Sequence, residues 1–208
     1  MHSAVLIVAR PARQPRIECA GGVAVRATEP NTVHLVSTAA TPLGGDTIAL
    51  RVIVERGAML RVRSAAATIA LPGRTTAEST AHWHLEVSGD LDIDPQPTVV
   101  AGGSRHVTST RLSVDASGRV RVRERVQIGR TDDRQGFWSG SLRADVNGQP
   151  LLRHRIELGE ESATHDLLGA PLASVSELRY PDIAADALGT VLELADGGSL
   201  ATWQGERL

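Results

Sequence analysis

The stretch TIALRVIVERGAMLRV, residues 47–62, decides the fold class. In its first half the apolar side chains occupy every second position: Ile48, Leu50, Val52 and Val54. A turn at Glu55-Arg56-Gly57 follows, and the alternation resumes at Leu60 and Val62. Because successive side chains of a β-strand point to opposite faces, this period of two residues predicts two strands, each with one buried face.

The same alternation, interrupted each time by a turn of Gly, Asp, Asn or Ser, recurs over residues 79–94, 107–128 and 140–158. Short strands at this spacing predict an all-β fold, as a sandwich, a barrel or a solenoid. Helical periodicity is weak except in EESATHDLLGA (160–170) and PDIAADALG (181–189), where we expect one or two short helices. Because no linker or change in composition divides the chain, residues 1–208 are expected to form a single domain.

The composition excludes several classes of protein. A single cysteine, Cys19, rules out an internal disulfide framework. No apolar run reaches the length of a transmembrane helix. The opening apolar run SAVLIVA has no basic segment ahead of it and is read as a first strand rather than a signal peptide, so we expect a cytoplasmic protein.

The charge balance does not favour a nucleic acid as a partner. All 22 basic residues are arginines, and 24 acidic residues bring the net charge to −2, which does not favour electrostatic capture of DNA or RNA. Aromatic side chains that could stack on bases are few: Trp83, Phe137, Trp138, Tyr180 and Trp203. We therefore expect neither a nucleic acid nor a membrane as partner.

Two ionisable residues stand where the alternation calls for apolar ones. Glu124 shares a predicted strand face with valines, and His154 shares one with leucine and isoleucine. A buried carboxylate is costly unless it is paired or hydrogen-bonded, so such residues need partners or a wet interior. They predict either a polar lining for a ligand or metal, or a bulge that returns them to solvent, or a plain buried ion pair.

The opposite face of the Glu124 strand carries four arginines: Arg119, Arg121, Arg123 and Arg125. Such a face either grips an acidic partner or phosphates, or is simply solvated and keeps the sheet soluble.

For catalysis the sequence offers little, because it has no lysine, no GxSxG motif and no dinucleotide-binding glycine pattern. Asp92 and Asp94 alternate on one polar face and leave open a β-sandwich carbohydrate-binding or hydrolytic module that uses both carboxylates. His82 and His84 also share a strand face, but no third ligand follows at metal-site spacing. We expect a protein without catalytic residues or a tightly bound cofactor.

Three segments occur in the order found in a known family. The first, residues 41–68, opens with the turn TPLGGD and continues as an alternating strand, a GA turn and an alanine-rich strand. The second, residues 85–106, is a hairpin that ends in a Pro-x-Pro segment. The third, residues 121–158, joins a strand, a Gly-Arg pair, a loop and a closing hairpin. Over about residues 35–160 this ordered set resembles the urease accessory protein D family, called UreD or UreH.

The resemblance implies a right-handed β-helix-like body of stacked sheets with one or two short helices near the C-terminus. It also implies a non-catalytic metallochaperone scaffold required for nickel insertion, which docks on the urease apoprotein and on accessory protein F, the carrier of the GTPase accessory protein G. The resemblance also implies an internal passage for nickel. If the chain has such a passage, three residues are candidate ligands for the ion in transit: Asp46, Glu124 and His154. The residues that match the family motifs are Gly44, Gly45, Asp46, Gly129 and Arg130.

Overall fold

The computed structural model describes residues 1–208 apart from 131–134, 164, 167–168 and 185–187. Its strands are β1 (His2–Ala9), β2 (Arg16–Ala20), β3 (Val23–Glu29), β4 (Thr32–Ser37), β5 (Thr47–Val54), β6 (Met59–Ser64), β7 (Thr68–Ala70), β8 (Glu78–Val87), β9 (Asp90–Ile93), β10 (Thr98–Val100), β11 (Arg105–Val114), β12 (Arg119–Ile128), β13 (Phe137–Val146), β14 (Gln149–Leu158), β15 (Ala173–Tyr180), β16 (Thr190–Glu193) and β17 (Ser199–Gly205). The all-β prediction is confirmed.

The helices expected near the C-terminus do not appear in the described part of the chain. The described residues of 160–170 form turns, with a single 3₁₀ position, and those of 181–189 form bends and irregular chain. Both segments also contain positions outside the described residues, namely 164, 167–168 and 185–187.

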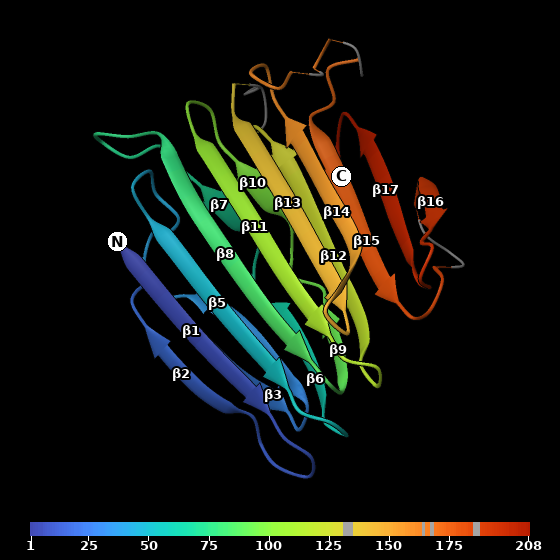
Figure 1. Cartoon of the computed structure of the whole chain (residues 1–208). Helices are drawn as coiled ribbons and strands as arrows, with labels where there is room; N and C mark the ends of the chain where they lie inside the picture. The colour runs from blue at the N-terminus through green and yellow to red at the C-terminus, as the bar shows by residue number, and fades with distance from the viewer. Residues whose placement is uncertain (131–134, 164, 167–168, 185–187) are drawn as a thin grey trace.

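Two sheets lie face to face, as Figure 1 shows. Sheet A has seven strands in the order β14-β13-β11-β8-β5-β1-β2, and sheet B has ten, with the main path β16-β17-β15-β12-β9-β6-β4-β3. The short strands β7 and β10 extend sheet B beside β12. Sheet B is interrupted in the middle. Short irregular segments separate β6 from β7 and β9 from β10.

The chain winds from one sheet to the other and back, so that β1, β5, β8, β11 and β13 are parallel neighbours in sheet A. This arrangement is a β-solenoid of about four turns. The register pairs Leu50 with Trp83, Trp83 with Thr110 and Thr110 with Leu142, at sequence separations of 33, 27 and 32 residues. Because the turns differ in length, the solenoid leaves no fixed repeat in the sequence.

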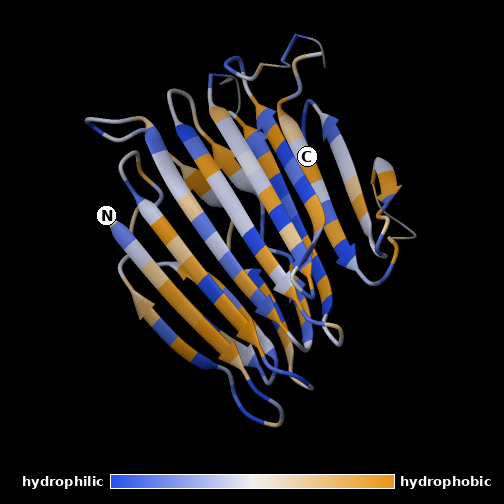
Figure 2. Cartoon of the chain, in the orientation of Figure 1, coloured by the Kyte–Doolittle hydropathy of each residue, from blue (hydrophilic) through white to orange (hydrophobic). Residues whose placement is uncertain are grey.

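The core lies between the two sheets and follows the two-residue alternation. Leu50, Val52 and Val54 are at most 3% exposed, and Leu60 and Val62 on the facing sheet are fully buried. Figure 2 shows the same alternation of hydrophobic and hydrophilic residues along individual strands. Each such side chain contributes roughly 1.5–3 kcal/mol of hydrophobic stabilisation, so the alternation fixes which face of every strand turns inward.

Candidate functional site

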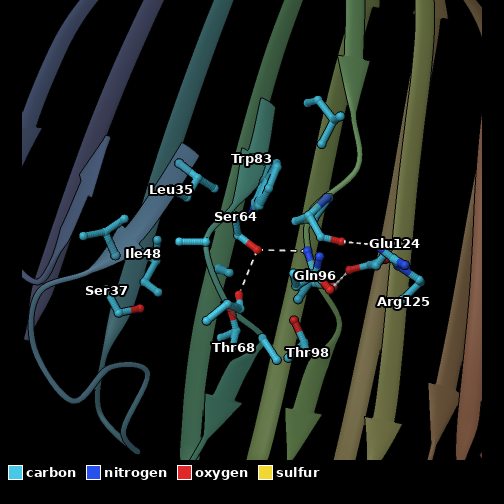
Figure 3. A pocket seen from close by; sticks show the side chains of 18 of the residues that line it. Leu35, Ser37, Ile48, Ser64, Thr68, Trp83, Gln96, Thr98, Glu124 and Arg125 are labelled. Atoms are coloured by element: carbon cyan, nitrogen blue, oxygen red, sulfur yellow. Dashed lines mark hydrogen bonds between the residues drawn. The ribbon is translucent and has the colours of Figure 1, made fainter. Parts of the chain in front are cut away.

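A cavity of about 250 Å³ lies between the sheets where sheet B is interrupted. Sheet A closes one side with Ile48, Ala81 and Trp83, and the small residues 65–67 between β6 and β7 leave the space open. The polar residues of its wall, several of which are labelled in Figure 3, are Ser37, Thr41, Ser64, Thr68, Gln96, Thr98, His106, Thr108, Thr110, Arg123, Glu124 and Arg125. The wall therefore carries polar groups from both sheets, with Thr108 and Thr110 on β11 of sheet A, and such a composition admits water or an ion.

Glu124 lies on the inward face of β12 and reaches across the cavity. Its Oε1 accepts a hydrogen bond of 2.8 Å from the hydroxyl of Thr108 on the opposite sheet. The register of β12 against β15 runs without a shift through the pair Glu124–Ser176, so no bulge returns this residue to solvent. Burial raises the pKa of Glu124 to about 7, and the hydrogen bond from Thr108 opposes only part of that rise.

His106 is a second titratable group in the cavity wall, one that the sequence analysis did not single out. It is 2% exposed, and its Nδ1 lies 2.9 Å from the hydroxyl of Ser79. Burial lowers the pKa of His106 to about 4, so the imidazole is neutral near pH 7. Its position could have been found from the sequence, because it continues the inward alternation of Thr108, Thr110 and Leu112.

His154 also lies on the inward face but not in the cavity wall. In sheet A it pairs with Leu142, which in turn pairs with Thr110 of the cavity. Two strand spacings, about 10 Å, therefore separate the His154 backbone from that of Thr110. Within the described chain its Nε2 is buried without a hydrogen-bond partner, and burial lowers the pKa of the imidazole.

The arginines of β12 face outward into a network of ion pairs. Arg121 contacts Asp92, Asp94 and Glu177, Arg125 contacts Asp94, and Arg63 from β6 lies 2.5 Å from Asp92. Asp92 and Asp94 are thus held by arginines on the outer face of sheet B. Because guanidinium groups of the chain itself occupy both carboxylates, neither is free to act on a glycosidic bond, and the alternative of a hydrolytic pair has no support in this geometry.

Asp46 organises the turn ahead of β5. Its Oδ2 accepts hydrogen bonds from the Thr41 hydroxyl, at 2.8 Å, and from the Leu43 amide, at 2.9 Å. Its Oδ1 contacts the amino group of Met1. Burial pushes the pKa of Asp46 upward, but these hydrogen bonds and the positive charge of that amino group outweigh it and hold the pKa below its usual value. Both oxygens are engaged by the chain itself, and Asp46 is not part of the cavity wall.

We expect Asp46→Ala to lower the free energy of unfolding at pH 7 by about 2 kcal/mol, because the Thr41 hydroxyl and the Leu43 amide lose their acceptor. Urea denaturation measures this loss, and Asp196→Ala, at an exposed turn position, serves as the control. Equal stability of the two variants would show that the turn does not need the carboxylate.

A sequence model of the UreD urease accessory protein family matches residues 9–201. The chain belongs to this family. Its relatives include urease accessory protein UreD 1 of Saccharopolyspora erythraea, 38% identical over 190 residues that cover 87% of this chain and 74% of the relative. Urease accessory protein UreD of Frankia alni is 42% identical over 150 residues, 71% of this chain and 47% of that protein. The chain thus spans about three-quarters of the first relative and about half of the second.

Membership of the UreD family confirms the resemblance read from the ordered segments and the prediction of a non-enzymatic role, because this family consists of accessory proteins without catalytic activity. A reaction centre at Asp92 and Asp94 is not consistent with membership of this family.

The glycines that match the UreD family motifs are explained by backbone geometry. A Cβ on Gly44 would lie 1.9 Å from the carbonyl oxygen of Thr76, so only glycine permits this close approach of two loops. Gly45 and Gly129 have φ angles of +92° and +75°, which other residues rarely adopt. Arg130 is exposed at the end of β12 and borders residues 131–134, which lie outside the described chain.

The candidate nickel ligands Asp46, Glu124 and His154 are not gathered into one site. Among the residues that the structure describes, no group of three or more His, Cys, Asp or Glu side chains is placed to hold a metal ion. His82 and His84 both lie exposed on the outer face of sheet A. In the described part of the chain, no helix is long and apolar enough to cross a membrane.

Proposed function

We propose that this chain serves urease maturation as a scaffold that passes nickel through its interior toward the urease apoprotein. The observation that carries the proposal is the cavity between the sheets, with the ionisable Glu124 in its wall. Membership of the UreD family supports the process, and the interior geometry supports the route. The proposed partners are the urease apoprotein and accessory proteins F and G, and the proposed compartment is the cytoplasm.

The chemistry of Glu124 suits an ion in transit. Nickel accepts carboxylate and imidazole ligands, and a passage functions when its ligands are too few to trap the ion. A carboxyl group with a pKa of about 7 binds a cation when ionised and releases it when a proton competes. In this proposal Glu124 is the carboxylate ligand of the cavity, and His154 lies further along the interior. Asp46 does not bind nickel in this proposal; it stabilises the turn ahead of β5.

The test is a reconstitution of urease activation from the apoprotein, nickel, bicarbonate, GTP and accessory proteins F and G, with and without this chain. We expect activation to depend on the chain and to fall about tenfold with Glu124→Ala, a loss typical of removing a group that tunes a metal path. Glu193→Ala, at an exposed position of β16, is the matched control and should leave activation unchanged. Equal activation without the chain would refute its role, and full activation by the folded Glu124→Ala variant would refute the role of Glu124.

A further inference from the structure

The outer face of sheet A carries a straight row of five basic side chains, here called the basic row: Arg51, His84, Arg111, Arg143 and Arg153. Each is the register partner of the next, from β5 through β8, β11 and β13 to β14. All five are exposed, because they alternate with inward residues such as Leu50 and Leu112. With about 4.8 Å between neighbouring strands, the row extends over about 19 Å of one continuous sheet.

Acidic side chains lie beside three members of the basic row, one of which is His84, whose Nε2 is 3.8 Å from Oε1 of Glu86. Arg51 lies 2.8 Å from Glu86, and Arg153 lies 2.5 Å from Asp145. In the described chain, Arg111 and Arg143, which face each other directly on β11 and β13, have no ion pair or side-chain hydrogen bond. Like charges directly opposite on neighbouring strands are destabilising, so Arg111 and Arg143 lower the stability of the isolated chain.

On sheet B, the outward arginines of β12 are neutralised by acidic side chains of the chain itself. Each outward arginine of β12 has an acidic partner: Arg119 pairs with Asp182, and the other three pair with Asp94 or Glu177. The lack of a counter-charge at Arg111 and Arg143 therefore distinguishes this pair from the outward arginines of β12. It does not follow from the overall composition, because the net charge of the chain is −2.

The geometry points to the basic row as a docking surface for a carboxylate-rich face of a protein partner. This inference rests on the proposed function in one respect, since it places the partner within the urease maturation machinery. Charge complementarity is its basis: carboxylates opposite Arg111 and Arg143 would supply the counter-charges that the chain lacks. Arginine suits such a role because its planar guanidinium binds a carboxylate through two parallel hydrogen bonds.

A protein fits this face better than a nucleic acid or a lipid surface does. Two residues along the strands, Glu86, Ser113 and Asp145 are register partners and form a parallel row with an acid at each end. These carboxylates would repel phosphates, whereas a protein can place basic groups opposite them and acidic groups opposite the basic row. The two rows together then fix the register of docking.

The experiment compares Arg111→Glu/Arg143→Glu with Arg26→Glu/Arg61→Glu. The second pair makes the same change of charge at exposed arginines of sheet B. Binding of each variant and of the unchanged chain to urease apoprotein, accessory protein F and accessory protein G is measured separately at low and at high salt. We expect the first pair to weaken binding to one of these proteins by about tenfold or more, and the control pair to weaken it less than about twofold. Arg111→Ala/Arg143→Ala, which adds no new charge, should weaken the same complex by an intermediate factor. Added salt should weaken binding of the unchanged chain.

Three results would overturn the docking surface: equal weakening by both charge-reversal pairs, no binding of the unchanged chain to any of the three proteins, or tighter binding through Arg111 and Arg143 to duplex DNA or phosphatidylglycerol vesicles. Thermal unfolding of every variant confirms that the fold is kept. The activation assay separates this inference from the proposed function. If activation requires the chain but the Arg111→Glu/Arg143→Glu variant binds and activates normally, the surface alone is refuted; if the unchanged chain does not support activation, the proposed function is refuted.

Discussion

Replacing Glu177 by alanine is expected to lower the free energy of unfolding at pH 7 by about 2–3 kcal/mol, less than the loss of a fully buried ion pair, because its arginine partners are partly exposed. Glu177 is 6% exposed and lies at the centre of the arginine network on sheet B. Its two oxygens accept hydrogen bonds from Arg121, at 3.0 Å, and from Arg179, at 2.5 Å. Removal of the carboxylate leaves partly buried guanidinium groups of two strands without their shared counter-charge.

The same contacts make the contribution of Glu177 depend on pH. Burial raises its pKa, but the hydrogen bonds and charges of Arg121 and Arg179 outweigh burial and hold the pKa below its usual value. A group whose pKa is lowered by folding stabilises the folded state above its unfolded pKa and loses that contribution as the pH falls. Urea denaturation at pH 7 and pH 4 should therefore show a smaller difference between Glu177→Ala and the unchanged chain at pH 4. Glu193→Ala is the control, and a loss below about 1 kcal/mol at pH 7 would contradict the assigned role of the network.

The second large effect concerns Glu124 and has the opposite dependence on pH. Its pKa rises from 4.5 to about 7 on folding, so the folded state favours the protonated carboxyl. A raised pKa gives stability that is present below the unfolded pKa and is lost as the pH rises through the folded pKa. We expect the free energy of unfolding to fall by about 2–3 kcal/mol between pH 5 and pH 8 from this one group.

Glu124→Gln tests this expectation, because glutamine keeps an oxygen for the Thr108 hydroxyl but does not ionise. The variant should match the unchanged chain at pH 5 and exceed its stability at pH 8 by about 2–3 kcal/mol. Glu193→Gln is the control at an exposed position. Parallel stability curves for Glu124→Gln and the unchanged chain would mean that Glu124 ionises freely in the folded protein. A stabilising substitution in the cavity would show that the chain keeps this carboxylate at the expense of stability, as functional sites often do.

The sequence predicted the parts of this structure that depend on local alternation. A period of two residues identified the buried faces of β5, β6, β8 and β9 and the inward position of Glu124, because burial acts on each strand separately. The same reasoning overlooked His106, which obeys the alternation but lies among threonines and serines rather than aliphatic residues, where a polar residue does not stand out.

What the sequence could not show depends on contacts between distant residues. Arg121 meets Glu177 across 56 positions, and Thr108 meets Glu124 from the opposite sheet, so neither pair follows from periodicity. Unequal turn lengths hid the repeat of the solenoid, so the strand spacing left a solenoid open beside a sandwich and a barrel, and the family resemblance favoured the solenoid. Asp46 was expected on a nickel path through its motif, whereas the hydrogen bonds that engage it come from a turn whose geometry no spacing rule describes.

The most direct test of the central claim is to block the cavity of one folded protein reversibly and measure urease activation. In a Cys19→Ser/Thr110→Cys variant, the native exposed thiol is removed and a new thiol lines the cavity. A bulky methanethiosulfonate reagent attached there, with mass spectrometry to confirm the labelling, should lower activation about tenfold or more, and reduction of the label should restore it. The same reagent on Cys19 of the unchanged chain should have no effect. Full activation by the labelled Thr110→Cys variant would contradict the account, because nickel would then reach urease without passing through the interior of the solenoid.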